Sequence, residues 1–397
     1  MYRLLHIITD TNIGGAGVLL LCQLKYFDRT KFDIGVVLPR ESELIPRVKA
    51  LGYEVIESRR GADSSFEMTA IGEYVRIIKK YRSDIVHCHG ALSARIAALI
   101  CGVPVRIHTR HCAYPPRAAM RRPPVSWITG WLNNTLSSGI VAVAEAAVED
   151  LTALGTHFDK IRVIINGAEP LKKLSDDERR AARMALGFSD NDFVVGIFAR
   201  LEQCKGHKYL FEAVAKMGKE SRIKILLCGR GSLADELRRL AASLDILDRV
   251  VFAGFCPDIS PYMNAVDLNV NCSVGTETSS LALSEGMSLG RAAVVSDYGG
   301  NGAMVENGVS GVVVPRANVE ALAAVLSELE NDRELLESMG AAARRRYDER
   351  FTPQRMTHEL ENFYLEQLES VNAKRKNAVK KSEHKTKPAS HFLKMRR

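Results

Sequence analysis

The sequence has no apolar run long enough to span a membrane. A spanning helix needs about 20 predominantly apolar residues, and the best candidate, residues 96–105, is short and has the pattern of a helix, a turn and a strand. A strand-like segment begins at residue 3, which leaves no room for a signal peptide before it. These absences predict a cytoplasmic protein.

Paired cysteines are missing as well. The eight cysteines are scattered without a C-x-x-C motif, and several fall within apparent strands. Disulfide frameworks and structural zinc sites are recognised by cysteine spacing and by compartment, and neither pattern is present. We therefore expect reduced thiols in the core.

The body of the chain lacks a strong net charge of either sign. The formal charge of the whole sequence is +8, but residues 374–397 contain ten Lys or Arg and one Glu, so the preceding residues sum to −1. The basicity belongs to a tail. A nucleic-acid partner is therefore not expected for the body.

Apolar runs alternate with helical patterns along most of the chain, which is typical of parallel α/β folds. A charged segment, residues 171–190, separates two sets of strands. Two such sets predict two Rossmann-like domains whose parallel sheets face a cleft. The predicted strands are residues 4–9, 32–38, 54–57, 85–89, 105–109, 139–143, 162–165, 193–198, 224–228, 250–253, 266–271, 293–296 and 311–314.

Four segments follow from this pattern. We place the first domain at residues 1–168 and the second at residues 169–350. An amphipathic helix is expected within residues 351–372, with an apolar side. Residues 373–397 lose the apolar pattern and are predicted to be a basic, disordered tail.

Two glutamates lie where a predicted strand gives way to a helix. Residues 266–273 have the pattern of a buried strand, and Ser279 is expected to cap a helix over residues 280–289. Glu277 then lies in the loop and Glu285 in the helix, on either side of the free amide groups at the helix start. Two acceptors that flank an anion site suit a nucleotide-sugar.

These residues resemble the signature of glycosyltransferase family four (glycosyl transferases group 1). In that signature two glutamates, eight positions apart, precede a small-residue helix and a Gly-Gly turn, and residues 277–300 show this order. The resemblance covers residues 1–370 and implies the retaining GT-B architecture, with a last helix that returns to the first domain. The family commonly has an acidic residue soon after the Gly-Gly turn, whereas residues 299–303 contain none, so the sugar preference is harder to infer.

The resemblance also implies roles for single residues. Glu277 would lie beside hydroxyls of the transferred sugar, and Glu285 would accept hydrogen bonds from the ribose. Arg200 and Lys205 would hold the donor phosphates and stabilise the leaving diphosphate. The segment between the glutamates would complete the donor site with Thr278, Ser279, Ser280 and Leu281.

A glycine cluster, residues 14–17, follows the first predicted strand. A nicotinamide-binding fingerprint would require a glycine at position 20, which is leucine here. A glycine turn without a ligand is the other alternative. By resemblance, Gly15 and Gly17 would flank the diphosphate and sugar of the donor.

Four histidines lie on or after two neighbouring predicted strands. His87 and His89 share one face of a strand, an arrangement that can bind metal, but no second ligand pair is evident and a core or cleft-rim position is favoured. By resemblance, the histidine of Thr-x-His lies near the donor sugar. This pattern indicates His111, with His108 as the alternative.

The acidic pair of Asp190-Asn-Asp192 matches the D-x-D metal motif of another glycosyltransferase architecture. It precedes a predicted strand, where Asp and Asn favour turns for backbone reasons. We predict a turn there, and neither a metal nor another cofactor for the protein.

A basic, proline-rich segment, residues 115–124, precedes a predicted helix with Trp127, Trp131 and Leu132 on one face. A basic loop beside an aromatic helix suits an anionic membrane surface. The alternative is a pair of core tryptophans and a solvated tail.

The sequence thus favours a retaining glycosyltransferase that moves a sugar from a nucleotide-sugar, in the first place a UDP-sugar. The acceptor would be a saccharide or a lipid-linked saccharide in surface polysaccharide biosynthesis, reached at the inner face of the cell membrane. Two alternatives remain: a sugar-nucleotide epimerase of the same architecture, and an inactive scaffold that acts through the basic tail.

Overall fold

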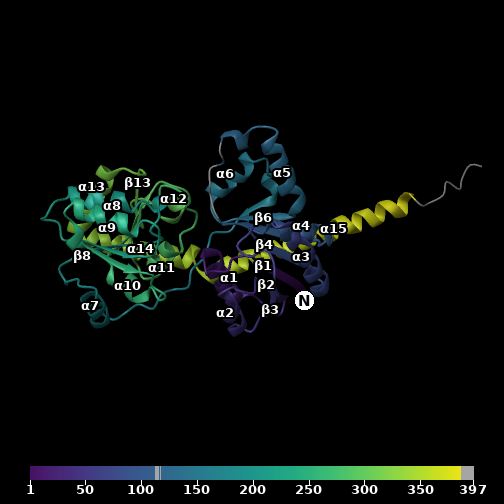
Figure 1. Cartoon of the computed structure of the whole chain (residues 1–397), viewed down its shortest axis with the longest axis horizontal. Helices are drawn as coiled ribbons and strands as arrows, with labels where there is room; N and C mark the ends of the chain where they lie inside the picture. Colours follow the sequence, from purple (N-terminus) through teal and green to yellow (C-terminus); the bar gives the residue numbers. More distant parts are fainter. Residues whose placement is uncertain (112–115, 117, 386–397) are drawn as a thin grey trace, which may run out of the picture.

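The computed structural model describes residues 1–111, 116 and 118–385, which form two Rossmann-like α/β domains (Figure 1). Both sheets are parallel throughout the described strands, which confirms the predicted fold class. The strand orders are β3-β2-β1-β4-β5-β6-β7 and β10-β9-β8-β11-β12-β13. In each sheet the order reverses beside the domain's first strand, and sheets of this kind bind ligands at that point.

The first domain contains seven strands, and every strand predicted for it is present with ends within two residues of the prediction. The strands are β1 Tyr2–Ile8, β2 Phe32–Pro39, β3 Glu54–Ser58, β4 Ile85–His89, β5 Val105–Arg110, β6 Gly139–Ala142 and β7 Ile161–Val163. The helices are α1 Gly15–Tyr26, α2 Leu44–Ala50, α3 Met68–Tyr81, α4 Leu92–Ile100, η1 Ala118–Arg121, α5 Val125–Leu136, α6 Glu145–Ala153 and η2 Phe158–Lys160.

The second domain contains the six strands that the sequence predicts, again within two residues at each end. The strands are β8 Phe193–Phe198, β9 Ile223–Cys228, β10 Val250–Gly254, β11 Leu268–Asn271, β12 Ala293–Ser296 and β13 Gly311–Val314. The helices are α7 Asp176–Ala185, η3 Gln203–Lys205, α8 His207–Lys216, α9 Ala234–Ser243, η4 Leu247–Arg249, α10 Ser260–Ala265, α11 Leu281–Ser288, α12 Asn301–Met304, α13 Val319–Asn331 and α14 Arg333–Arg350.

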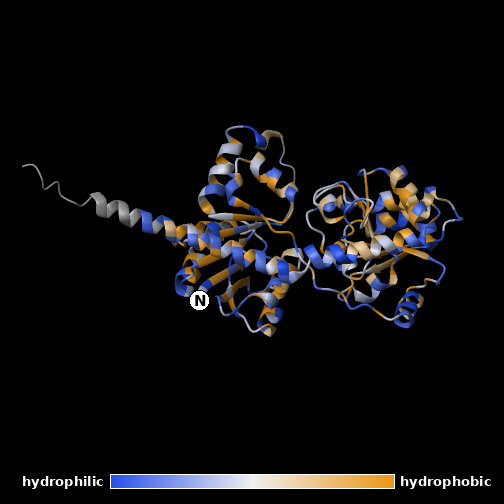
Figure 2. Ribbon diagram, turned by 180° about the vertical axis from the view of Figure 1, so that it is seen from behind, coloured by the Kyte–Doolittle hydropathy of each residue, from blue (hydrophilic) through white to orange (hydrophobic). Residues whose placement is uncertain are grey.

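Helices cover both faces of each sheet, and Figure 2 shows apolar residues along the strands between them. In the first domain, α1, α2 and the last helix pack on one face, and α3 and α4 pack on the other. Strands buried on both faces must be apolar almost throughout. This requirement explains why the strands could be located from the sequence.

The last helix, α15 (Pro353–Lys385), leaves the second domain and packs across the first (Figure 1). Its buried apolar side chains include Met356, Leu360, Phe363, Tyr364 and Leu368, which belong to the same core as Leu4 and Ile8 of β1. The helix runs beyond the predicted end at residue 372, so residues 373–385 are helical where we predicted disorder. Lys, Arg, Glu and Ala have high helix propensity, which favours continuation of the helix through this segment. The rest of the predicted tail, residues 386–397, lies outside the described residues.

Candidate functional site

A cavity of about 610 Å³ lies between the two domains, at the carboxyl ends of the strands that flank both switch points. The first domain contributes residues that follow β1, β4 and β5, and the second contributes residues that follow β8 and β11. Side chains that carry chemistry line this cavity from both sides. They are Asp10, His89, His108, Thr109, Arg110, His111, Asn166, Arg200, Lys205, Asn269, Asn271, Ser273, Glu277, Thr278, Ser279 and Ser280.

Lys205 and Glu277 form a buried ion pair in the cavity wall. Lys205 Nζ lies 2.8 Å from Glu277 Oε2, and the same oxygen accepts hydrogen bonds from Ser273 Oγ at 2.8 Å and Asn271 Nδ2 at 3.1 Å. Burial raises the pKa of the Glu277 carboxyl, but Lys205 and the two hydrogen bonds outweigh burial and leave that pKa below its usual value. Within the described residues, nothing hydrogen-bonds to Oε1. Glu277 is therefore a fixed carboxylate with one oxygen left for a ligand.

Glycines behind this pair let the backbone approach closely. Gly206, which follows Lys205, has φ +67°, and a Cβ there would lie 2.0 Å from the carbonyl oxygen of Cys272. A Cβ on Gly299 or Gly300 would lie 2.1 or 1.8 Å from the carbonyl oxygens of Glu277 and Thr278. The Gly-Gly turn therefore packs directly against the backbone of the loop that carries Glu277.

Helix α11 points its first turn at the cavity. Its N-cap is Ser280, whose Oγ accepts a hydrogen bond from Leu283 N, one residue later than the predicted cap at Ser279. Ser279 Oγ instead accepts a hydrogen bond from the backbone amide of Asn166 at 3.3 Å. The amides of Leu281 and Ala282 lie in the first helical turn and have no intrahelical acceptor, so they remain available to an anion.

Three hydrogen bonds join the domains at this edge of the cavity, one of them between Asn166 N and Ser279 Oγ. Thr278 Oγ1 donates to the carbonyl oxygen of His111 at 3.1 Å, and Asn166 Nδ2 donates to that of Ser279 at 3.4 Å. The predicted residues Thr278 and Ser279 therefore line the cavity while their side chains bridge the domains. Asn166 was not predicted as a site residue, because its partner lies more than a hundred residues away along the chain.

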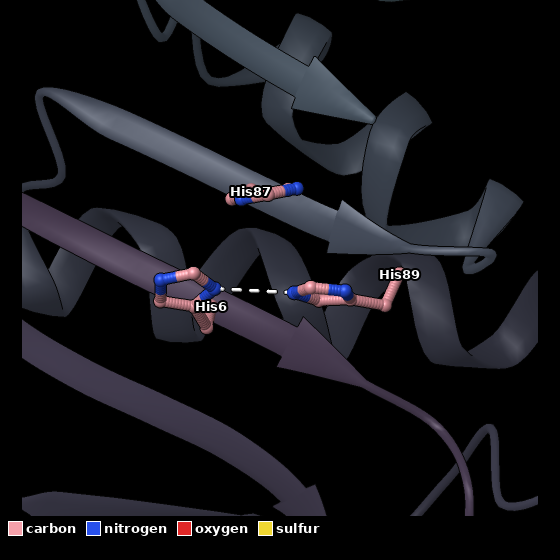
Figure 3. A group of neighbouring side chains, drawn as sticks. All are labelled: His6, His87 and His89. Atoms are coloured by element: carbon pink, nitrogen blue, oxygen red, sulfur yellow. Dashed lines mark hydrogen bonds between the residues drawn. The ribbon is translucent and has the colours of Figure 1, made fainter. Parts of the chain in front are cut away.

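Hydrogen-bonded histidines lead from the first sheet to the cavity, and Figure 3 shows two of them, His6 and His89. His6 Nδ1 lies 3.2 Å from His89 Nε2, and His89 Nδ1 lies 2.9 Å from His111 Nε2. Burial lowers the pKa of His6 to about 3 and that of His111 to about 4, and it holds the pKa of His89 well below the usual value. These imidazoles are therefore neutral at physiological pH, and hydrogen bonds fix the ring of His111 at the cavity. His108 also lines the cavity, so both alternatives for the sugar-site histidine lie there.

Among the described residues, His6, His87 and His89 form the one group with metal-binding proximity, their nitrogens lying within 4.8 Å of one another. The His87 and His89 rings are stacked, with centroids 4.4 Å apart and planes at 21°. Stacked rings direct their in-plane lone pairs side by side, whereas metal ligands must direct them at one point. Both nitrogens of His87 are engaged, by the hydroxyls of Tyr364 and Thr109. This arrangement fits a hydrogen-bonded cluster better than a metal site.

The other predicted donor-site residues divide into two groups. Gly15 and Arg200 line the cavity, and Arg200 is exposed. Gly17 lies inside α1, where a Cβ would lie 3.0 Å from the Leu44 side chain, so it serves helix packing and does not line the cavity.

Asp10, which follows β1, lines the cavity and was not predicted as a site residue, because a single Asp after a strand is a common turn residue.

Glu285 faces a neighbouring groove of about 400 Å³, which is also lined by Lys25, Gly167 and Leu281. Burial raises the pKa of its carboxyl to about 7. Within the described chain, no hydrogen bond to this carboxylate is formed. Leu281 borders both the groove and the main cavity, so a ligand that passes over this residue contacts both glutamates.

The fold and the two-sided cleft define a glycosyltransferase of the GT-B type, and sequence comparisons agree. Residues 13–170 match the family described as Glycosyltransferase Family 4, and residues 178–346 match Glycosyl transferases group 1. The chain carries both domains in this order and is a glycosyltransferase.

Individual proteins show the same relationship. The chain is 23% identical over 382 residues to UDP-Gal:alpha-D-GlcNAc-diphosphoundecaprenol alpha-1,3-galactosyltransferase of Escherichia coli, covering 92% of this chain and 97% of that protein. It is 30% identical over 236 residues to O-antigen chain mannosyltransferase C of Escherichia coli, covering 58% and 61%. The structure of Anabaena Alr3699/HepE in complex with UDP superposes with a TM-score of 0.80 at 21% identity, covering 92% and 100%.

Proposed function

We propose that this glycosyltransferase transfers a sugar from a UDP-sugar to a saccharide or lipid-linked saccharide, with retention of anomeric configuration. The observation that carries the proposal is the Lys205–Glu277 pair, which lies beside the free amides of α11 in a cavity open to both domains. A cation, a helix start and a carboxylate thus line one cavity, and these are the groups that would bind a diphosphate and the hydroxyls of a sugar.

The donor diphosphate would lie over the start of α11. The amides of Leu281 and Ala282 donate to it, and Arg200 and Lys205 supply positive charge. Lys205 uses one ammonium proton for Glu277 and has two more to donate. As the bond to the sugar breaks, negative charge grows on the leaving diphosphate, and these donors stabilise it.

The transferred sugar would lie between Glu277 and His111. Glu277 Oε1 accepts a sugar hydroxyl while Oε2 is held by three donors. A carboxylate so stabilised is a weak nucleophile, and neither glutamate is set opposite the other as in a glycosidase. Retention would then follow from attack on the same side as the leaving group, with a phosphate oxygen of the donor taking the proton of the acceptor hydroxyl. Glu285 would accept ribose hydroxyls in the adjoining groove.

The names of the similar proteins support the donor and acceptor classes. The Escherichia coli galactosyltransferase is named for a UDP-sugar and a diphosphoundecaprenol acceptor, and the other Escherichia coli relative for an O-antigen chain. A place in surface polysaccharide biosynthesis, in the cytoplasm at the inner face of the membrane, agrees with both. No helix in the described part of the chain has the length and hydropathy that a membrane crossing needs.

The test is turnover with defined substrates. The full-length protein is incubated with UDP-glucose, UDP-galactose and UDP-N-acetylglucosamine, each with and without a diphosphoundecaprenol-linked saccharide, and product configuration is read by NMR. We expect an α-linked product that requires the acceptor. A new nucleotide-sugar formed from the donor alone would instead support the epimerase alternative. A β-linked product would contradict retention, and the absence of turnover with every donor would leave the scaffold alternative.

A further inference from the structure

The outer face of α5 is more apolar than its inner face. Trp127, Ile128 and Trp131 are 70%, 56% and 64% exposed, although they fall within about 100° of the helix circumference. The buried residues on the opposite side include Ser126 and Gly130. Helices of soluble domains normally bury their apolar face. Because the tryptophans are exposed, the alternative that they belong to the core is wrong.

Helix α5 is firmly held in this orientation. Its Gly130 touches the backbone at Gly155, where a Cβ on Gly130 would lie 2.3 Å from the carbonyl oxygen. Asn133 accepts a hydrogen bond from Arg95 and donates one to Thr156. The inner face therefore cannot exchange with the outer one without loss of these contacts, and the apolar face stays exposed.

The surroundings of this face favour anionic partners. Residues 85–144 contain six arginines and no Asp or Glu. Arg121 and Arg122, both exposed, lie directly before α5, as does the exposed Met120. Tryptophan beside arginine is the composition of segments that lie at the interface of anionic membranes.

We propose that this surface, formed by Met120, Arg121, Arg122, Trp127, Ile128 and Trp131 and here called the α5 face, docks into the headgroup region of an anionic lipid bilayer. The two tryptophans together would bury roughly 300–500 Å², less than the about 800 Å² per partner of a standard protein interface. Binding to a bilayer does not require an interface of that area, because a few inserted apolar side chains and nearby cations are sufficient for attachment.

The α5 face lies near the catalytic cleft. Figure 1 places α5 on the first domain, beside α6 and away from the second domain. His111 lines the cleft and Ala118 begins η1, so six residues, or seven Cα–Cα steps, separate them along the chain. That length of chain spans at most about 25 Å. The docked enzyme would thus hold its cleft within reach of a lipid-linked acceptor, and in this respect the inference rests on the proposed function.

Tryptophan fluorescence tests the inference directly, because Trp127 and Trp131 are the only two tryptophans in the chain. Vesicles of phosphatidylcholine alone, or mixed equally with phosphatidylglycerol, are added to the full-length protein. We expect a blue-shifted emission with the mixed vesicles only, and quenching when their acyl chains carry bromine. Protein that sediments with the mixed vesicles without a shift or quenching would show attachment through the tail and overturn the proposal, as would the absence of binding.

Variants separate the contributions of the side chains, with sedimentation as the readout. Trp127→Ser combined with Trp131→Ser should lower the affinity for mixed vesicles at least tenfold, while Met184→Ser, which changes a 74% exposed side chain on α7, should not. Arg122→Ser should lower it roughly fivefold, and Arg345→Ser, an exposed control on α14, should leave it unchanged. Equal binding by the wild type and the tryptophan variant would overturn the proposal.

The oligomeric state and the thermal stabilisation by UDP are also measured for each variant. If the wild type is a dimer that the tryptophan substitutions dissociate, the α5 face joins two copies of the chain and the membrane proposal fails. Thermal stabilisation by UDP should persist in every variant, because the α5 face is outside the cleft. Loss of vesicle binding with UDP stabilisation retained therefore separates this inference from the proposed function.

Discussion

At the scale of single residues, the Lys205–Glu277 pair is the most informative feature. Both side chains are largely buried, so removal of the cation leaves a buried carboxylate that only Ser273 and Asn271 satisfy. We expect Lys205→Ala to lower turnover roughly 100-fold or more, because one preorganised donor to the leaving group is lost. It should also destabilise the fold by about 2 kcal/mol.

The matched control is Lys216→Ala, which breaks an exposed ion pair with Glu320. This change should cost less than about 1 kcal/mol and leave turnover unchanged. Initial rates and thermal unfolding of the three proteins provide the comparison. A Lys205→Ala enzyme with near-normal turnover would remove Lys205 from the mechanism.

Glu285 predicts a pH dependence of stability. Burial raises the pKa of its carboxyl from 4.5 to about 7, so the folded protein retains a proton that the unfolded chain has released. The free energy of unfolding should therefore fall as the pH rises from about 4.5 to about 7. Glu285→Gln removes this loss, so the stability of the variant relative to the wild type should be about 3 kcal/mol higher at pH 8.5 than at pH 4.5.

The comparison is made between the variant and the wild type at each pH. The buried histidines resist protonation, so they destabilise both proteins equally below pH 6.5, and this contribution cancels in the difference. Thermal unfolding midpoints at pH 4.5 and pH 8.5 measure the effect. A difference that does not change with pH would show that the carboxyl of Glu285 is not buried in the folded protein.

At the scale of secondary-structure elements, the Gly299-Gly300 turn should be intolerant of a side chain. A Cβ on Gly300 would lie 1.8 Å from the carbonyl oxygen of Thr278, so the backbone of the donor loop must shift. We expect Gly300→Ala to weaken binding of UDP at least tenfold, as measured by calorimetry. Gly302→Ala has open space around it and is the control. Equal affinities of the two variants would show that the turn does not position the loop.

Helix α15 should divide into a stabilising part and a dispensable part. Tyr364 is fully buried between Phe27 and Phe32 and contacts His87, so Tyr364→Ala should cost about 3–5 kcal/mol in unfolding free energy. Within the described residues, truncation after Ala373 removes no member of the apolar core, and it should change stability by less than about 0.5 kcal/mol. Thermal unfolding of both variants tests this division, and a large loss on truncation would contradict it.

Elements were more predictable than contacts. All thirteen strands could be located because strands buried on both faces are continuous apolar runs. The start of α11 was misplaced by one residue, since Ser279 and Ser280 are equally good caps and the choice depends on Asn166, which occupies the Ser279 hydroxyl. Gly17 was assigned to the donor site by family resemblance, whereas the structure places it against the Leu44 side chain and outside the cavity lining.

Contacts between residues far apart in the chain could not be predicted from the local sequence. His6 has the appearance of one polar residue in a buried strand, and only the fold brings it to His89. Asn271 and Ser273 follow a strand like many turn residues, and their role appears once they are seen to hold Glu277. The family resemblance supplied what periodicity could not, namely the functions of Arg200 and Lys205.

At the scale of the whole molecule, the two domains are joined by two chain crossings that contact each other. Ala168 N donates to the carbonyl oxygen of Phe351 at 3.1 Å, and Tyr347 Oη donates to that of Ala168 at 2.7 Å. These bonds fix one end of the cleft, while Thr278 and His111 meet across it. A donor in the cavity would contact both domains and stabilise them together.

The most direct test of the central claim is a thermal-shift comparison of nucleoside diphosphates and their sugars without added metal. Ligand that binds only the folded protein stabilises it by about 2.7 kcal/mol at a hundredfold excess over its dissociation constant. We predict that UDP and UDP-sugars raise the unfolding midpoint of the wild type selectively and raise that of Lys205→Ala much less. Equal midpoints with every nucleotide at millimolar concentration would contradict a donor site in this cleft.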